Sequence, residues 1–371
     1  MTNCKKYNLF VFLSMIGRSM IETFPPLILY NYGISIKLII FYFFIRYLSA
    51  IPINILFVKM TKKFGSKLMI FISSITIGIT YYYLYNMEFS IINIVILSIL
   101  TTTYVYSYWT VRNYYMLQVI NRNTVTSNMS YITIVNILAI MPAVYIGAFI
   151  LEKFNLLTLI MIVFIINILS VIPLLFIKTK NIDESGLKGL KNIPNVSKVI
   201  MLLDQFKTII LSIFPLYIYI YINQNYTYLG VFNLLTGLAS ILVVYVFSKI
   251  ITLKHKSYLS ITIILLSVCF LIKLFIHDNY IFLSIAILEG IFTKMEELSI
   301  GSNIYKLGKN FNYMSYILIT ENLFNLSRLF ISSILLLFNN ILTMLIICII
   351  GFFTCSFFKF EIEPKKWYIN I

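Results

Sequence analysis

The first apolar segment of the chain contains a pair of opposite charges. In SMIGRSMIETFPP (residues 14–26), Arg18 and Glu22 stand four residues apart, a spacing that brings two side chains together on one face of a helix. A charge inside an apolar segment is unfavourable unless an opposite charge or a polar cavity compensates it. A carboxylate in such surroundings binds a proton more readily, and a neighbouring arginine opposes this effect. The pair could therefore carry protons and bind a charged solute, or it could be a static ion pair.

Further charges lie in other apolar segments. The basic residues there are Arg18, Arg46, Arg112, Lys207, Lys294 and Arg328, and the acidic ones are Glu22, Asp204, Glu289, Glu296, Glu297 and Glu321. Their equal numbers predict internal neutralisation. Arg112, Asp204 and Lys207 are close enough to a segment end to extend toward water instead. The deepest charges are Arg18, Glu22, Arg46, Glu289 and Glu321. They lie roughly 13–18 Å from an end, so they either form ion pairs between helices or handle solute and protons directly.

Polar residues also form stripes along four of these segments, because residues three, four or seven apart share a helix face. The stripes are Ser14/Arg18/Glu22, Thr101/Tyr104/Tyr108/Arg112/Tyr115, Glu289/Thr293/Glu296 and Glu321/Asn325/Arg328. Lys294 and Glu297 lie off the third stripe and are expected to pair with a neighbouring helix. Stripes on several helices predict one shared cavity near the middle of the membrane. The predicted residues for binding solute and protons are Arg18, Glu22, Arg46, Tyr108, Arg112, Asp204, Glu289, Glu296, Glu321, Asn325 and Arg328.

The composition identifies these segments as membrane-spanning helices. The 371 residues are 60% hydrophobic and 11% charged, whereas soluble proteins are roughly 45–50% apolar and about 25% charged. A spanning helix needs about 20 apolar residues. Cutting the chain at its polar breaks gives about twelve spans: 9–30, 35–58, 67–86, 90–118, 128–151, 155–177, 199–222, 228–250, 257–276, 280–304, 312–337 and 339–359. The sequence predicts an all-α integral membrane protein with two six-helix bundles, residues 1–177 and 199–371, and a cytoplasmic linker over 178–198.

The basic residues predict which ends of the spans face the cytoplasm. With the N-terminus inside, twenty of the 29 Lys and Arg fall in inner segments, and only Lys37, Lys153 and Lys273 fall in outer ones, as the positive-inside rule requires. Both termini are therefore expected in the cytoplasm, and Lys37 and Lys273 are expected to be anchors at the outer interface. The net charge of +16 then reflects topology, so we expect no nucleic acid as a partner. The expected surroundings are the lipid bilayer of a bacterial plasma membrane, crossed many times.

The chain resembles the major facilitator superfamily over almost its whole length. In that family the first, fourth, seventh and tenth helices line a central cavity, and the charged spans here include all four. The loop VKMTKKFGSK (58–67) is similar to the family motif G-x-x-x-D-R-x-G-R-R. Lys63, Gly65 and Lys67 match its arginine, second glycine and final positive charge, and the resemblance implies that they belong to a gating loop. Val58 replaces the first glycine, and Lys62 replaces an acid that helps close the cytoplasmic side in the family.

Two further segments are similar to family motifs. VRNYYMLQ (111–118) resembles the arginine motif of the fourth helix, with Arg112 as its arginine. LAIMPAVYIG (138–147) keeps Pro142 and Gly147 of the glycine–proline motif that exporters carry in the fifth helix. The resemblance supports the fold and leaves the subfamily open.

The resemblance implies a secondary transporter that moves a small organic solute by alternating access, and a monomer is the usual state in the family. Glu22, Glu289 and Glu321 are the predicted proton carriers. Arg18, Arg46 and Arg112 favour an anionic or zwitterionic solute, and the many tyrosines favour an amphipathic or aromatic one. Two alternatives stay open: a lipid or glycolipid flippase of the same fold, and a structural or sensing membrane protein that transports nothing.

An enzyme is not predicted. Membrane enzymes usually cluster Asp, His or Glu at one membrane face, whereas His255 and His277 stand in separate loops with no partner at ligand spacing. The chain contains no G-x-x-x-x-G-K-[ST] segment that would bind a nucleotide to power transport. The four cysteines have no metal-binding spacing. No metal or cofactor is therefore expected.

Overall fold

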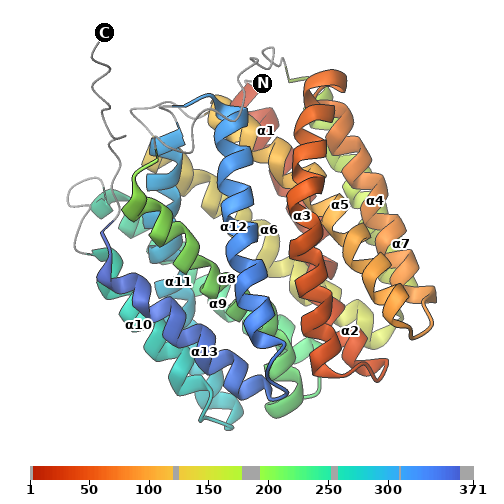
Figure 1. The fold of residues 1–371 in the computed structure, drawn as a ribbon, viewed down its shortest axis with the longest axis vertical. Helices are drawn as coiled ribbons and strands as arrows, with labels where there is room; N and C mark the ends of the chain where they lie inside the picture. The colour runs from red at the N-terminus through yellow and green to blue at the C-terminus, as the bar shows by residue number, and fades with distance from the viewer. Residues whose placement is uncertain (1–2, 120–124, 178–192, 252–257, 309–310, 360–371) are drawn as a thin grey trace.

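The structure is a computed structural model that describes residues 3–119, 125–177, 193–251, 258–308 and 311–359. These residues form an all-helical fold (Figure 1). The helices are α1 (Asn3–Glu22), α2 (Pro25–Asn31), α3 (Ile36–Phe64), α4 (Ser66–Asn86), α5 (Ile91–Val119), α6 (Val125–Lys153), α7 (Leu156–Leu175), α8 (Asn195–Tyr221), α9 (Tyr226–Ile251), α10 (Tyr258–Lys273), α11 (Asn279–Gly308), α12 (Tyr313–Leu335) and α13 (Ile341–Thr354). Among the described residues, 7 helices are long and apolar enough to cross a membrane by length and composition alone.

The helices follow the predicted spans closely, with one difference near the N-terminus. The span predicted over 9–30 is broken, because α1 ends at Glu22 and α2 begins at Pro25. Proline has no backbone N–H, which makes it suitable for a first helical turn and unsuitable for a helix interior. Pro25 and Pro26 therefore start a new short helix instead of only bending the first one. The predicted linker over 178–198 lies outside the described residues up to 192.

Several helix ends are fixed by asparagine side chains. The side chains of Asn155, Asn312 and Asn340 accept hydrogen bonds from the backbone N–H groups of Thr158, Ser315 and Leu342. This N-cap bond satisfies one of the N–H groups that have no partner within the helix. Gly65 separates α3 from α4 with a φ of 86°, a conformation that favours glycine. Short polar breaks can therefore end one long helix and begin the next.

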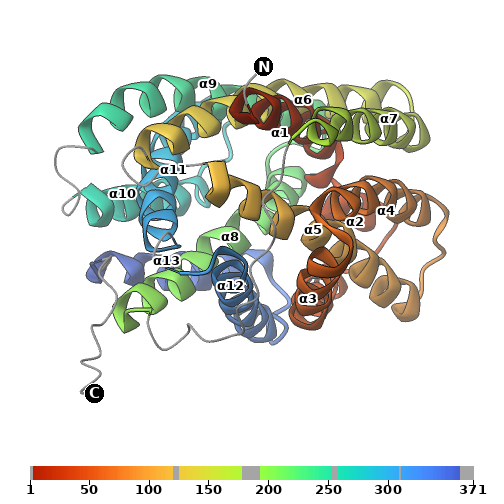
Figure 2. The same ribbon diagram turned by 90° about the horizontal axis from the view of Figure 1, so that it is seen from above.

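The helices of the first half of the chain, α1–α7, pack largely on one another, and so do those of the second half, α8–α13 (Figure 2). The first half contains the pairs α1–α7, α1–α6 and α3–α5, and the second half contains α9–α11, α10–α11 and α8–α13. The halves meet where α6 packs on α9, α3 on α12 and α2 on α8. A site between α1, α3, α8 and α12 would therefore lie between the two halves of the chain.

Glycines allow two close helix crossings, one between α6 and α1 and one between α11 and α9. A Cβ atom at Gly147 of α6 would lie 2.0 Å from the backbone oxygen of Met20 in α1. A Cβ atom at Gly290 of α11 would lie 2.3 Å from the backbone oxygen of Thr236 in α9. Both distances are far below van der Waals contact, so only glycine fits. Gly147, singled out in the sequence for its motif, brings α1 against α6.

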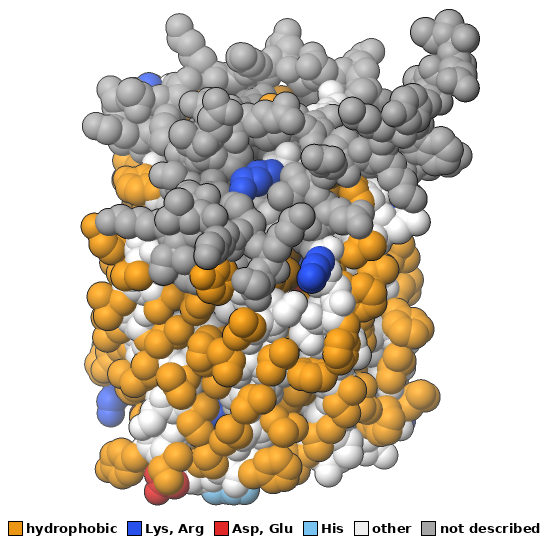
Figure 3. All heavy atoms as spheres, turned by 90° about the vertical axis from the view of Figure 1, so that its left-hand side faces the viewer, with side chains coloured by type: hydrophobic (Ala, Val, Ile, Leu, Met, Phe, Trp, Pro, Cys, Tyr) orange, Lys and Arg blue, Asp and Glu red, His pale blue; other side chains and the backbone are white. Residues whose placement is uncertain are grey.

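Apolar side chains cover much of the outer surface of the bundle. In Figure 3 they fill the face formed around α10 and α13, and acidic and histidine side chains lie at its lower edge. Lys6 and Lys67 donate hydrogen bonds to the backbone oxygens of Phe176 and Leu175 at the end of α7. We call this the basic end of the bundle; α1 begins there, and α3, α5, α7 and α11 end there. The broad apolar surface is that of a multi-pass membrane protein.

Candidate functional site

A cavity of about 480 Å³ lies between the two halves of the chain. We call it the central cavity. Two charged residues line it, Glu22 at the end of α1 and Arg46 in α3. Its wall also contains the break between α1 and α2 and the aromatic side chains of Tyr42, Tyr104 and Trp109. The cavity therefore combines both signs of charge with aromatic surface.

Arg18 fixes the position of Glu22 from behind the cavity wall. The guanidinium of Arg18 is 1% exposed, and its Nη1 donates to Oε1 of Glu22 at 3.0 Å. Its Nη2 donates to the hydroxyl of Ser73 in α4 at 2.5 Å. The guanidinium also lies 3.8 Å from the ring centroid of Tyr108 in α5. Arg18 is thus held on three sides by the first half of the chain, while the side chain of Glu22 keeps 27% of its surface exposed.

The polar stripe of α5 connects helices within the first half of the chain. Its hydroxyl groups pair with side chains of α1, α3 and α4 at 2.7–3.1 Å: Tyr108 with Ser14, Thr101 with Tyr42, Tyr104 with Tyr81 and Tyr115 with Ser66. Of the residues in this stripe, Tyr104 lines the central cavity. Arg112 lines a second cavity, which is described next, and the other three residues line neither. The stripe predicted to face one shared cavity therefore packs mostly between helices, and Arg18 and Tyr108 lie behind the cavity wall.

A second cavity, of about 370 Å³, adjoins the central cavity toward the basic end. We call it the arginine chamber, because Arg46 of α3, Arg112 of α5 and Arg328 of α12 all line it. Among the described residues of its lining, Glu321 of α12 is the only carboxylate. Arg46 and Trp109 line both cavities. The two cavities are therefore adjacent parts of one polar region between the halves.

Uncharged groups hold the charges of the chamber. Arg112 donates to the side chain of Asn136 at 3.1 Å and lies 4.5 Å from the ring centroid of Trp109. Nε of Arg328 donates to Gln205 at 2.8 Å, and Glu321 accepts from Asn113 at 3.0 Å. Among the described residues, no ion pair joins Arg46, Arg112 or Arg328 to a carboxylate. At these three arginines, the internal neutralisation predicted from the equal numbers of charges is therefore not achieved by ion pairs within the described part of the chain.

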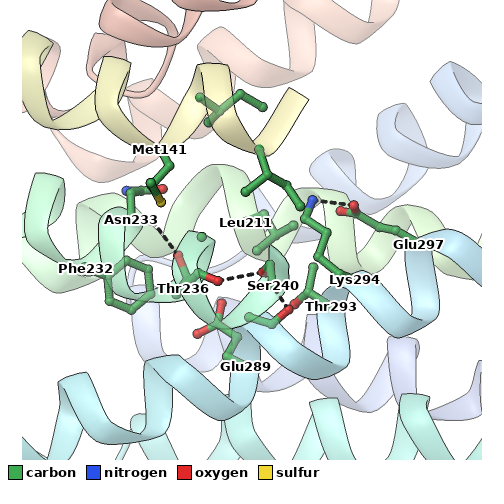
Figure 4. Close-up of a pocket in the computed structure, with 14 residues that line it drawn as sticks. Met141, Leu211, Phe232, Asn233, Thr236, Ser240, Glu289, Thr293, Lys294 and Glu297 are labelled. Atoms are coloured by element: carbon green, nitrogen blue, oxygen red, sulfur yellow. Dashed lines mark hydrogen bonds and ion pairs between the residues drawn. The ribbon is translucent and has the colours of Figure 1, made fainter. Parts of the chain in front are cut away.

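A smaller pocket of about 190 Å³ lies between α6, α9 and α11 (Figure 4). Glu289 points into it from α11, beside Thr236 and Ser240 of α9. Glu289 forms an ion pair with Lys273, whose side chain has no exposed surface. The ammonium of Lys273 lies 4.2–4.5 Å from the ring centroids of Phe214, Phe232 and Phe282. The prediction that Lys273 is an interfacial anchor is wrong, because the packing of α10 on α11 turns this side chain into the bundle.

Two other expectations for charged side chains also differ in the structure. Lys294 pairs with Glu297 on its own helix at 2.5 Å, because residues three apart are neighbours on a helix surface. Lys207 is buried and pairs with Asp204 at 3.2 Å and with Glu296 of α11. The side chain of Lys207 therefore stays inside the bundle and does not extend toward water. Asp204 and Glu296 do not line any of the three cavities.

Hydrogen bonds join the two halves on both sides of the central cavity. Toward the basic end, Asn54 donates to Asn322 at 3.1 Å, and Tyr106 donates to the buried Asn325. At the opposite end, Asn31 donates to Tyr219 at 3.0 Å and to Tyr226 at 2.6 Å. Asn325, predicted as a binding residue, therefore connects α5 to α12 beside the chamber.

Among the described residues, the predicted gating-loop side chains have their hydrogen bond and ring contact within the first half of the chain. Lys67 donates to the backbone oxygen of Leu175 at 2.7 Å. Lys63 lies 5.1 Å from the ring of its neighbour Phe64, and Gly65 forms the turn described above. Among the described contacts, the halves are joined at this end by the asparagine and tyrosine bonds instead. A gating role for the loop stays a prediction.

Sequence reasoning missed several residues that shape these cavities. Trp109 separates the two cavities and stacks on Arg112, and Asn113 holds both Glu321 and the hydroxyl of Tyr305 at 3.0 Å. Neither residue lies on the stripe that begins at Thr101, so helical spacing alone gave no signal. Their positions depend on how α5 is rotated against α11 and α12, which is a property of packing.

Both the sequence and the fold of the chain can be compared with those of known proteins. The model of the Major Facilitator Superfamily matches residues 8–295. No curated protein matches the sequence. The fold is similar to that of a bacterial homologue of the iron transporter ferroportin in an outward-facing state, with a TM-score of 0.67, 11% identity and coverage of 96% of this chain and 98% of that one. It is also similar to the nucleoside transporter NupG, with a TM-score of 0.65, 11% identity and the same coverage.

Proposed function

The chain belongs to the major facilitator superfamily, and on this premise we propose that it is a secondary active transporter that carries a small organic solute by alternating access. The central cavity supports this proposal, because helices of both halves of the chain form its wall. Rocking of residues 1–177 against residues 199–371 would open the cavity to one side at a time. The hydrogen bonds that join the halves on either side of the cavity, those of Asn54 and Asn113 on one side and Asn31 on the other, are contacts that such a motion would break in turn. We place the transporter in a plasma membrane, as a monomer with both termini in the cytoplasm.

We propose that protons drive this transport and that Glu22 carries them. The observation that carries the proposal is the contact between Arg18 and Glu22 at the wall of the central cavity. Arg18 stays buried whatever the state of Glu22, because Ser73 and Tyr108 hold it independently. Glu22 can therefore gain a proton from the cavity and lose it again without leaving its place. Glu289 and Glu321 line cavities as well, and we propose them as secondary candidates.

The lining of the cavities favours an anionic or zwitterionic solute with an aromatic or amphipathic body. Arg46 supplies positive charge to the central cavity, and Tyr42, Tyr104 and Trp109 supply surfaces on which a flat group can stack. Of the similar structures, one is a homologue of an iron transporter and the other is a nucleoside transporter, as their names state. Three arginines beside the cavity would repel a metal cation, so we do not extend the iron cargo to this chain.

Proton-driven transport in vesicles tests the role of Glu22. Purified protein would be reconstituted with an imposed pH gradient and offered radiolabelled organic anions and nucleosides. We expect uptake that depends on the gradient in the unchanged protein. We expect Glu22→Gln to lose this dependence and to keep exchange of solute without a gradient. The control is Glu88→Gln, which removes an exposed carboxylate from the loop before α5. If Glu22→Gln keeps its full dependence on the gradient, Glu22 is not the proton carrier.

A further inference from the structure

The charges around the two cavities do not cancel. Arg18 and Glu22 neutralise each other through their ion pair. Arg46, Arg112 and Arg328 then leave three positive charges at the arginine chamber, against the single negative charge of Glu321. The described part of the chamber therefore carries an excess of two positive charges. In a membrane interior, where charges attract and repel one another strongly, such an excess calls for a counterion.

We infer that the arginine chamber is a binding site for a divalent oxyanion, such as the phosphate of a monoester or a pair of carboxylates, and that this group is the charged end of the transported solute. The inference rests on the proposed transport function and names the chemistry of its solute. Two negative charges would balance the chamber. The volume of about 370 Å³ leaves room for such a group together with water.

The donors around the chamber fit an oxyanion better than a single negative atom. Guanidinium groups donate two parallel N–H bonds to phosphate or carboxylate oxygens, and three helices supply one guanidinium each. Arg112 is 5% exposed, yet its buried Nε has no partner among the described residues. A buried donor without a partner is unfavourable, so this N–H is available for a bound oxygen. Arg46 likewise has no hydrogen bond or ion pair from its guanidinium within the described part of the chain.

The charged groups of the chamber lie close enough to act on one ligand. Arg46, Arg112, Glu321 and Arg328 all line the same cavity of about 370 Å³. Tyr106 and Tyr305 line it beside them. Because α3 and α5 belong to the first half of the chain and α12 to the second, an oxyanion here would connect the two halves. Binding of the solute would thereby favour closure at the basic end.

The adjacent central cavity indicates what the remainder of the solute looks like. Arg46 and Trp109 line both cavities, so a ligand whose oxyanion lies in the chamber can extend past Trp109. The indole ring there offers a face for a ring of the solute. A soluble phosphate monoester with an aromatic or heterocyclic body would therefore use both cavities. Inorganic phosphate would use only the chamber.

Direct binding tests the inference without any transport measurement. The thermal unfolding midpoint of the full chain in detergent would be measured against inorganic phosphate, phenyl phosphate, succinate and chloride at constant ionic strength. We expect each divalent anion to raise the midpoint and chloride to have no specific effect, with phenyl phosphate bound more tightly than inorganic phosphate. Arg328→Gln and Arg112→Gln should each weaken phosphate binding at least tenfold. Lys62→Gln, which removes an exposed charge at the basic end, should leave it unchanged.

Three outcomes would overturn the inference. The first is protection of the unchanged protein by phosphate that is no stronger than protection by chloride, a result that does not depend on any variant folding. The second is equal weakening by Lys62→Gln and Arg328→Gln, which would indicate binding to the basic surface. The third is protection by phosphatidic acid vesicles with none by the soluble anions, which would indicate a lipid ligand. Glu22→Gln should bind phosphate normally, so failure of the proton-coupling proposal would leave this test intact.

Discussion

Two of the buried ion pairs, one in each half of the chain, join a basic side chain to a glutamate in different surroundings. Arg18 and Glu22 lie one helical turn apart on α1, and the carboxylate keeps 27% of its surface exposed toward the central cavity. Lys273 and Glu289 lie on two helices, α10 and α11, and their side chains are 0% and 5% exposed. In the first pair only the cation is enclosed by protein. In the second pair the cation is fully enclosed, and the carboxylate is almost fully enclosed although it borders the small pocket between α6, α9 and α11.

This difference predicts two roles for the pairs. A carboxylate that touches a cavity can exchange protons and contact a solute, and it keeps some solvation when its partner is lost. A carboxylate that is fully enclosed depends on its partner, because an uncompensated buried charge is strongly destabilising. The cation of the second pair is also surrounded by three phenylalanine rings. We therefore interpret Lys273–Glu289 as a contact that holds α10 on α11, and Arg18–Glu22 as a contact that prepares a site.

The largest expected effect follows from removing Lys273. Lys273→Met leaves Glu289 enclosed without a counter-charge, which should cost about 3–5 kcal/mol of unfolding free energy. The measurement is the unfolding midpoint in detergent. The control is the double variant Lys273→Met/Glu289→Met, which replaces the pair by apolar groups and should recover most of the loss. A single variant as stable as the unchanged protein would show that the second pair is not structural, and the comparison would fail.

The helix pattern could be predicted from sequence because apolar length and polar breaks are local properties. Ser66, Ile91 and Tyr313 each begin a helix within one residue of a predicted span. Depth along a span could also be counted from the sequence. What counting cannot give is the direction in which a side chain points, since this depends on how each helix is rotated against its neighbours. Lys273 was placed at a span end, near its observed position, yet its side chain points into the bundle.

The same reasoning separates the parts of the candidate site that were predicted from those that were not. A spacing of four residues places Arg18 and Glu22 on one helix face, and the structure contains the ion pair between them. The pairing of Lys273 with Glu289 crosses from α10 to α11, and the gathering of Arg46, Arg112 and Arg328 requires three helices from both halves. Such contacts depend on tertiary packing, which no spacing within one helix encodes.

A smaller effect is expected from the matching change in the first half of the chain. Arg18→Met should cost about 1–3 kcal/mol, the range for losing hydrogen bonds to a charged group. Glu22 still reaches the central cavity, and Ser73 keeps its bond to the backbone oxygen of Tyr104 at 2.8 Å. The measurement is again the unfolding midpoint, taken beside that of Lys273→Met. Equal losses in the two variants would mean that exposure to the cavity does not relieve Glu22.

The smallest expected effect concerns the hydroxyl that holds Arg18 from α4. Ser73→Ala removes the acceptor of Nη2 of Arg18, while Glu22 and the ring of Tyr108 still hold the guanidinium. The expected cost is about 1 kcal/mol, and the gradient dependence of transport should persist. The matched control is Ser74→Ala, because Ser74 is buried beside it and, within the described part of the chain, bonds only to the backbone oxygen of Ile70 in its own helix, at 3.0 Å. If Ser73→Ala abolishes the gradient dependence while Ser74→Ala does not, the precise placement of Arg18 sets the proton affinity of Glu22. In that case Glu22 would depend on the position of Arg18 as strongly as Glu289 depends on Lys273. The two pairs would then differ only in that Glu22 borders the central cavity.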